Sequence, residues 1–285
     1  MTGASTRDRA LVLGAGGVTG IAWLSGLVHA LTEQGVALAD ASLILGTSAG
    51  AVVAVRLFDE GGAADLFARQ VEPERQVAEI EPPAERVAHL IAAASEEGGL
   101  EASERLARRA LLARETPDDG GRRRAVISDR IGRDAWPSAK LRLCAVDVDS
   151  TALAVFDADT GVSLIDAVAA SCAVPGIWPP VRVGDRVFMD GGVRSTDNSD
   201  LATGWAKILV LAPISRPPAS GIPGLEGNIR ALEASGSAVL AVTPDTHAQT
   251  ACGLNPFSPE RRPDAARAGY DQGRRAAEQI KSFWG

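Results

Sequence analysis

The chain has 285 residues, of which 46% are hydrophobic and 23% are charged, so it can bury one large core. Its net charge is -7, which excludes the overall positive field that attracts nucleic acid. Its 3 cysteines, Cys144, Cys172 and Cys252, are too widely spaced for a disulfide framework or a metal-binding pattern. Each is expected to be a small core residue in a reducing compartment.

The N-terminal segment Met1 to Arg9 is polar and lacks the apolar core of a signal peptide. No run in the chain reaches the ~18 apolar residues of a membrane-spanning helix. We therefore expect a cytoplasmic protein, with no more than a transient, peripheral contact with a membrane surface.

Apolar runs and helical patterns alternate along most of the chain. The predicted strands are Ala10–Leu13, Ser42–Leu45, Leu141–Val148, Leu153–Phe156, Arg186–Met189, Ile208–Ala212 and Ala238–Val242. The predicted helices are Thr19–Glu33, Ala49–Asp59, Ile165–Cys172, Leu225–Ala234 and Ala265–Phe283. This alternation predicts an α/β fold with a mostly parallel sheet covered by helices on both faces.

Residues 61–134 differ from the rest because they are rich in arginine and glutamate and contain no convincing strand. Val87, Leu90 and Ile91 follow helical spacing. We interpret 61–134 as a helical insert, and a candidate cap, within one domain that spans 1–285. The run Pro117–Arg124 is predicted to be a flexible loop, solvated or in contact with an anionic lipid surface through its arginines.

A glycine-rich turn, Gly14 to Gly20, follows the first strand. It approximates the G-x-G-x-x-G fingerprint of dinucleotide sites, for which the partner acid would be Glu33 or Asp40. The alternative is an oxyanion hole, in which backbone N–H groups of the turn stabilise a negative oxygen beside a catalytic serine. The second interpretation is favoured because a candidate serine follows.

That serine is Ser48, in the pentapeptide Gly46-Thr47-Ser48-Ala49-Gly50 between an apolar run and a helical stretch. Strand, G-x-S-x-G and helix form the context of a nucleophile elbow, a sharp turn that exposes the hydroxyl above the sheet. A glycine-rich turn with serine as helix N-cap is the alternative.

A serine nucleophile requires a base. His29 and His89 have no motif around them, whereas His247 would give the chain order of a Ser–Asp–His triad. The other candidate is Asp190, which closes the strand Arg186–Met189 and precedes two glycines. Asp-Gly-Gly at a strand end is also a common tight turn.

Four motifs together resemble the patatin-like phospholipase family: the glycine loop, G-x-S-x-G, the segment Ala170–Pro180 and Asp190-Gly191-Gly192. They occur in the family's order and at similar spacing. The likeness extends from about residue 10 to about residue 280, includes the helix around Ala268–Gly273, and leaves only the charged insert poorly matched.

This resemblance implies a three-layer α/β/α fold and a Ser–Asp dyad without histidine, with Ser48 as nucleophile and Asp190 as its base. It implies an oxyanion hole at Gly16 and Gly17, and no metal or cofactor. Two positions depart from the family loop, because Ala15 replaces a glycine and Thr19 replaces a basic residue. An alanine at a position of positive φ would cost on the order of 1 kcal/mol.

Three functions follow from these residues. The first is a serine acyl hydrolase acting on lipid or simpler acyl esters. The second keeps the acyl-enzyme but transfers the acyl group to another acceptor, and the third is a binding protein on a degenerate scaffold. Trp23, Trp178 and Phe188 are candidates for the substrate pocket, or for the core.

Overall fold

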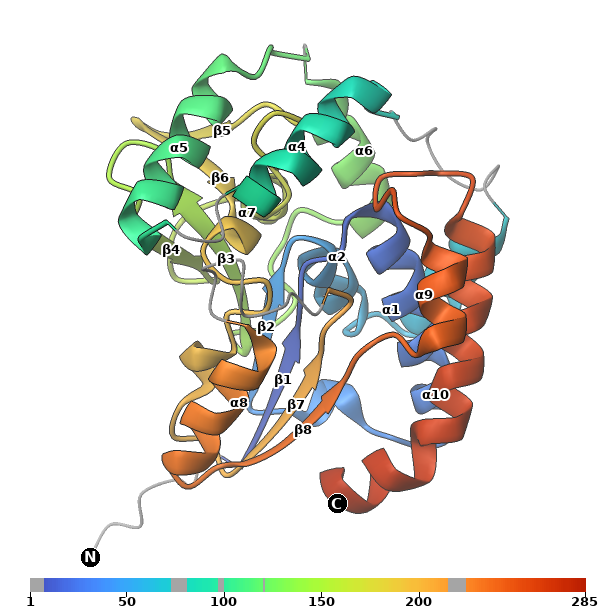
Figure 1. Ribbon diagram of the computed structural model, residues 1–285. Helices are drawn as coiled ribbons and strands as arrows, with labels where there is room; N and C mark the ends of the chain where they lie inside the picture. Colours follow the sequence, from blue (N-terminus) through green and yellow to red (C-terminus); the bar gives the residue numbers. More distant parts are fainter. Residues whose placement is uncertain (1–7, 73–80, 97–99, 120, 215–223) are drawn as a thin grey trace, which may run out of the picture.

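The computed structural model describes residues 8–72, 81–96, 100–119, 121–214 and 224–285. These residues form an eight-stranded mixed sheet with the order β5-β6-β3-β2-β1-β7-β8, and β4 pairs with β3 (Figure 1). The strands are β1 (Arg9–Leu13), β2 (Leu43–Thr47), β3 (Leu141–Asp147), β4 (Leu153–Phe156), β5 (Val181–Val183), β6 (Arg186–Asp190), β7 (Lys207–Leu211) and β8 (Ala238–Val242).

Ten α-helices accompany the sheet in the described part of the chain. They are α1 (Gly17–Glu33), α2 (Ala49–Arg56), α3 (Gly62–Val71), α4 (Ala84–Glu96), α5 (Ala102–Glu115), α6 (Arg122–Ile131), α7 (Leu164–Ser171), α8 (Leu225–Ala234), α9 (Thr246–Cys252) and α10 (Arg262–Trp284). All the predicted strands and helices are present, within a few residues at their ends. The three-residue strand β5 and the short helix α9 were not predicted.

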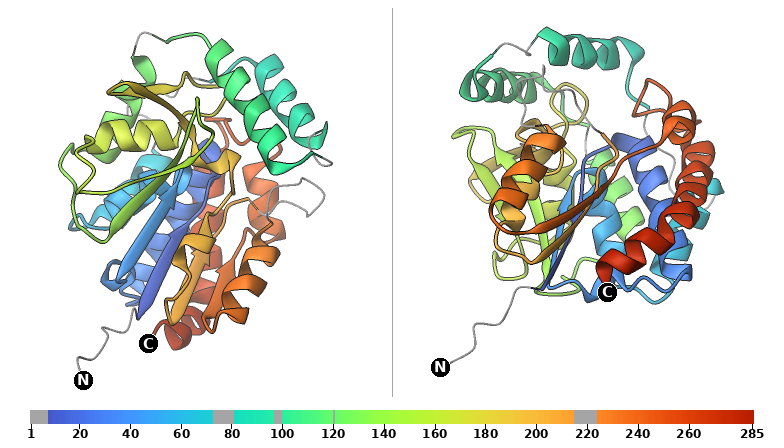
Figure 2. Two further views of the ribbon diagram at one scale, coloured as in Figure 1. Left: turned by 90° about the vertical axis from the view of Figure 1, so that its left-hand side faces the viewer. Right: turned by 60° about the horizontal axis from the view of Figure 1, so that its bottom comes forward.

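Both faces of the sheet are buried, as expected for strands between two helical layers. Leu11 and Leu13 of β1 point into a core shared with α1, α2 and α10, whereas Ala10 and Val12 pack on the opposite side with α8. Figures 1 and 2 show α8 on one side of the sheet and α1 with α10 on the other. The fold is therefore the predicted three-layer α/β/α arrangement.

The carboxyl ends of β2 and β6 meet beside β3. β2 runs parallel to β3 and its last residue, Thr47, pairs with Cys144. β6 runs antiparallel and its last residue, Asp190, pairs with the next residue of β3, Ala145. Consecutive strand residues are about 3.4 Å apart, so the residues that follow Thr47 and those around Asp190 are brought into one place.

The described residues of the segment 61–134 form the helices α3 to α6 with short connections, and none of these residues is in a strand. α3 packs against α1, and α6 packs against α2 and α7, so both belong to the helical layer of the main body. α4 and α5 instead lie across the carboxyl end of the sheet (Figures 1 and 2). No helix in the described ranges combines the length and apolar character needed to cross a bilayer.

The prediction of a loop over Pro117–Arg124 is wrong at its end, because α6 begins at Arg122. The carboxylate of Asp119 accepts hydrogen bonds from the N–H groups of Gly121 and Arg123, which caps the helix. Arg123 is buried 4.4 Å from the Trp178 ring, and Arg124 pairs with Asp166 at 2.7 Å. Burial lowers the pKa of the Arg123 guanidinium. Arg123 is therefore a buried helix residue, whereas Arg124 is a helix residue that remains exposed.

Candidate active site

Ser48 stands on a strained turn between β2 and α2. Its φ of 53° and ψ of -113° are unusual for a residue with a side chain, and such a conformation persists only where the surroundings hold it. A Cβ at Gly46 would lie 2.7 Å from Ala51 Cα, and one at Gly50 would lie 2.0 Å from Leu13 O. The two glycines of G-x-S-x-G are thus required by close backbone approach. Ser48 is not a simple N-cap, since its side chain makes no capping hydrogen bond.

The turn after α7 braces both Ser48 and Asp190. Ser171 Oγ accepts a hydrogen bond from Ser48 N at 2.9 Å, and Cys172 Sγ donates to Ser48 O at 3.3 Å. Burial raises the pKa of Cys172 to about 12, so the thiol keeps the proton that it donates. Ala173 O accepts from Asp190 N at 2.9 Å. Three consecutive residues of the Ala-Ser-x-Ala segment therefore fix the backbone of the two candidate catalytic residues.

Asp190 ends β6 with its carboxylate buried and oriented. Its Oδ1 accepts a hydrogen bond from Gly192 N at 2.7 Å, and 3% of the residue is exposed. A Cβ at Gly191 would lie 2.5 Å from Cys144 O, so only glycine lets the chain turn this close to β3. Asp-Gly-Gly is thus a tight turn that also fixes the orientation of the Asp190 carboxylate.

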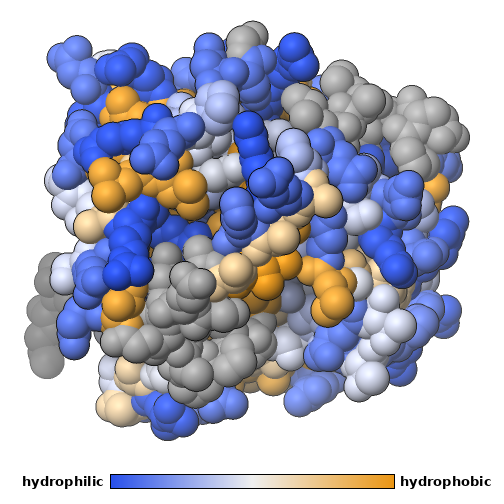
Figure 3. Space-filling model, turned by 45° about the horizontal axis from the view of Figure 1, so that its top comes forward, coloured by the Kyte–Doolittle hydropathy of each residue, from blue (hydrophilic) through white to orange (hydrophobic). Residues whose placement is uncertain are grey.

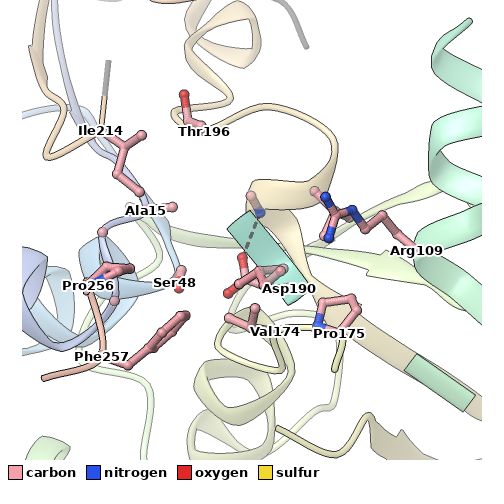
Figure 4. A pocket seen from close by; sticks show the side chains of 15 residues that line it. Ala15, Ser48, Arg109, Val174, Pro175, Asp190, Thr196, Ile214, Pro256 and Phe257 are labelled. Atoms are coloured by element: carbon pink, nitrogen blue, oxygen red, sulfur yellow. Dashed lines mark hydrogen bonds between the residues drawn. The ribbon is translucent and has the colours of Figure 1, made fainter. Parts of the chain in front are cut away.

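Ser48 and Asp190 line one cavity, shown in Figure 4. Its wall is mostly apolar, and Asp190 and Arg109 are its only charged residues among those the structure describes. The lining residues are Ala15, Gly16, Gly17, Ser48, Leu90, Arg109, Val174, Pro175, Asp190, Gly192, Val193, Thr196, Ile214, Pro256 and Phe257. All four residues predicted for the site, Ser48, Asp190, Gly16 and Gly17, are among them.

The glycine loop leaves backbone donors at this cavity. The N–H groups of Ala15 and Thr19 donate to Thr196 O and Pro256 O, whereas those of Gly16 and Gly17 have no acceptor among the described residues. Gly17 has a φ of 64°, and a Cβ there would lie 2.6 Å from Pro256 O. Both N–H groups lie at the N-terminus of α1, where the helix dipole favours an anion.

The departures at Ala15 and Thr19 do not distort the loop. Ala15 is absent from the described non-glycine residues with positive φ, which are Ser48, Thr151 and Asn198, so the conformational cost considered for it does not arise. Thr19 is buried, and its hydroxyl contacts the thiol of Cys252.

The dinucleotide interpretation fails on geometry. Its acid must reach a ligand at the glycine loop, but Glu33 ends α1, which has 17 residues and is therefore about 25 Å long. The Glu33 carboxylate accepts a hydrogen bond from Tyr270 at 2.7 Å. Asp40 lies in the short 3-10 helix that precedes β2, at the opposite end of that strand from Ser48.

The histidines lie outside the cavity. His247 is exposed in the first turn of α9, His29 stacks on Phe67, and His89 is exposed on α4. Because none of them lines the cavity with Ser48, the arrangement gives no triad.

The aromatic residues predicted as pocket candidates belong to the core. Trp23, Trp178 and Phe188 are buried but none lines the cavity, whose aromatic residue is Phe257. Phe257 and Arg109 were missed by sequence reasoning. Arg109 lies in a charged insert, four residues after the buried Arg105, so the two residues share one face of α5. The sequence alone does not show that this face is the buried one.

A family model described as patatin-like phospholipase matches residues 11–203, well over half of the chain. The chain belongs to the patatin-like phospholipase family. It is accordingly a patatin-like lipid acyl hydrolase. A search of curated proteins found no match.

Solved structures with a similar fold include VipD from Legionella pneumophila, with 14% sequence identity and a TM-score of 0.47. The match covers 96% of this chain and 67% of VipD. The type III effector protein ExoU has 18% identity and a TM-score of 0.40, with 96% of this chain and 53% of ExoU covered. This chain thus spans about half the length of that effector.

In this patatin-like site a buried amide links the two strand ends. Asn198 Nδ2 lies 3.1 Å from Thr47 Oγ1 and 3.3 Å from Gly191 O, so it bridges the residue before Ser48 and the residue after Asp190. Asn198 has a φ of 53°, a conformation that asparagine tolerates better than most residues. We infer that this bridge holds Ser48 and Asp190 at a fixed separation.

We predict that Asn198→Ala slows phosphonylation of Ser48 by a fluorophosphonate by ~10–100-fold, because small displacements of reacting groups have effects of this size. The labelling rate is measured by intact-mass spectrometry, and thermal unfolding is followed in parallel. Gln70→Ala is the control for loss of a buried amide, since Gln70 accepts a hydrogen bond from Arg262 at 3.0 Å and touches neither strand end. If both variants label at the same rate, Asn198 does not position the pair.

Proposed function

We propose that this chain hydrolyses lipid acyl esters through a Ser48–Asp190 dyad and an acyl-enzyme intermediate. The observation that carries the proposal is the common cavity of Ser48, on its strained elbow, and Asp190, with a mostly apolar wall. An apolar wall suits acyl chains, and a few polar groups at one point fix the ester.

The reaction would begin with transfer of the Ser48 hydroxyl proton to the Asp190 carboxylate as Oγ attacks the ester carbonyl carbon. Collapse of the tetrahedral intermediate releases the alcohol, which takes the proton from Asp190, and leaves the acyl group on Oγ. Asp190 then removes a proton from water as the water oxygen attacks the acyl carbonyl carbon. Collapse of this second tetrahedral intermediate releases the free acid, and the proton on Asp190 passes to Ser48 Oγ, which restores the hydroxyl and the carboxylate. A carboxylate with an ordinary pKa of about 3.9 can serve only if it is held within hydrogen-bond reach, which the bracing of Asp190 favours.

The N–H groups of Gly16 and Gly17 are proposed to stabilise the oxyanion of both tetrahedral intermediates. They have no protein acceptor in the described part of the chain and border the cavity at the amino end of α1. Loss of one such donor typically costs ~3 kcal/mol of transition-state stabilisation.

We predict that Ser48→Ala abolishes hydrolysis of a short-chain phospholipid and that Asp190→Asn lowers kcat by at least ~10³-fold, whereas His247→Ala retains wild-type kcat. Release of free fatty acid is measured by titration, with circular dichroism as the control for folding. An unchanged rate of hydrolysis in Ser48→Ala would contradict the proposal that Ser48 is the nucleophile. If an added alcohol yields a new ester in place of free fatty acid, the enzyme transfers the acyl group to that alcohol.

The opening of the cavity is also proposed to contact the membrane surface. The large hydrophobic residues exposed in the described structure are Ile91, Leu111 and Leu254, at 48%, 56% and 95%. Ile91 and Leu111 lie on α4 and α5, the helices that contribute Leu90 and Arg109 to the cavity. Leu254 lies in the loop between α9 and α10, shortly before Pro256 and Phe257, which line the cavity. Figure 3 shows apolar patches scattered among hydrophilic residues on this side of the molecule.

The same arrangement supports one domain over residues 1–285 in which 61–134 is an insert whose helices α4 and α5 cap the cavity. A cytoplasmic location with peripheral membrane contact remains the prediction from the sequence.

We predict that Leu254→Ser weakens binding to phosphatidylcholine vesicles by ~10-fold or more, because burial of a leucine side chain is worth about 1.5–3 kcal/mol. Vesicle co-sedimentation measures the affinity, and Leu254→Ile, which keeps the apolar surface, is the control. Equal binding by Leu254→Ser and wild type would show that this loop does not enter the lipid.

A further inference from the structure

The cavity contains a cation that the proposed dyad does not use. Arg109 lines it together with Ser48 and Asp190, and only 5% of the residue is exposed. In Figure 4 its side chain extends from α5 toward the side of the cavity where Asp190 lies. Because this guanidinium lines a wall that is otherwise mostly apolar, it would face a substrate bound in the cavity.

The packing of α5 fixes this orientation. Ala110 and Ala113 of α5 pack with Val146, Val148 and Met189, at the end of the sheet that carries Asp190. With that face of α5 against the sheet, Arg109 is buried at the cavity. Its neighbour Arg108 remains exposed and pairs with Glu104 at 3.0 Å. Two adjacent arginines are thus divided between the cavity and solvent.

We propose that Arg109 selects the substrate by binding the phosphodiester of a glycerophospholipid whose acyl ester lies at Ser48. A guanidinium carries five N–H donors in a planar fork that matches two phosphate oxygens, so contacts with the protein and with a phosphate are compatible. In a glycerophospholipid only part of the glycerol backbone separates the scissile ester from the phosphate, so one cavity can hold both. The glycine loop offers no cation for this purpose, since position 19 is threonine.

This inference rests on the proposed function, and it makes a separate claim. Arg109 is a specificity-determining residue, and its removal should change the choice between phospholipid and neutral ester. A merely structural arginine would lower the turnover of both substrates together.

The test compares kcat/KM for dioctanoylphosphatidylcholine with that for dioctanoylglycerol, presented in the same detergent micelles. We expect Arg109→Gln to lower the ratio of the two values by ~10–100-fold, the usual effect of losing a hydrogen bond to a charged group. Arg109→Lys, which keeps the charge but loses the fork, should give an intermediate ratio. Arg108→Gln on the exposed side of α5 should keep the wild-type ratio.

A ratio unchanged in Arg109→Gln, with Ser48-dependent hydrolysis intact, overturns the role of Arg109 and leaves the proposed function standing. An equal loss for both substrates also overturns it. Hydrolysis of neither substrate by the wild type would instead overturn the proposed function, and this inference with it.

A second measurement applies if Arg109→Gln does not fold. The wild-type enzyme is inhibited with a dioctyl ether phosphocholine and with the corresponding neutral dioctyl ether of glycerol. We expect the inhibition constant of the phosphocholine ether to be at least ~10-fold lower than that of the neutral ether. Equal inhibition constants for the two ethers would contradict the proposal.

Discussion

The meeting of β2 and β6 beside β3 is the constraint on which the site depends. Because Thr47 and Asp190 pair with consecutive residues of β3, one strand brings Ser48 and the other brings Asp190 to the same point. The two strands approach from opposite directions, so this junction requires a strand antiparallel to β3 next to the parallel strands β1, β2, β3, β7 and β8. The sheet must be mixed for the two side chains to share a cavity.

Such a junction leaves little room for side chains. Glycines at 46, 50 and 191 lie where a Cβ would come within 2.0 to 2.7 Å of neighbouring backbone atoms. The turn after α7 then fills the remaining space with Ser171 and Cys172, whose side chains bond the backbone of Ser48. The motifs that identify the family are therefore mainly residues that a crowded junction can accommodate, and the proposed pair Ser48 and Asp190 is a small part of them.

Much of this could be predicted from sequence, because apolar strands and glycine turns are local signals. The prediction of Ser48, Asp190, Gly16 and Gly17 depended on turns of this kind, and all four line the cavity. Arg109 and Phe257 could not be predicted, since their roles depend on which side of an element faces the cavity. The sequence of a charged, arginine-rich helix looks the same whether one of its arginines lines a cavity or all of them face solvent.

The central claim is that Ser48 is a nucleophile activated by Asp190 without a histidine. Intact-mass spectrometry after exposure to a fluorophosphonate tests it most directly, because the probe phosphonylates an activated serine with loss of fluoride. We predict one label on wild type and His247→Ala, none on Ser48→Ala, and labelling of Asp190→Asn slower by at least ~10³-fold. Loss of labelling in His247→Ala with retention in Asp190→Asn would contradict the dyad.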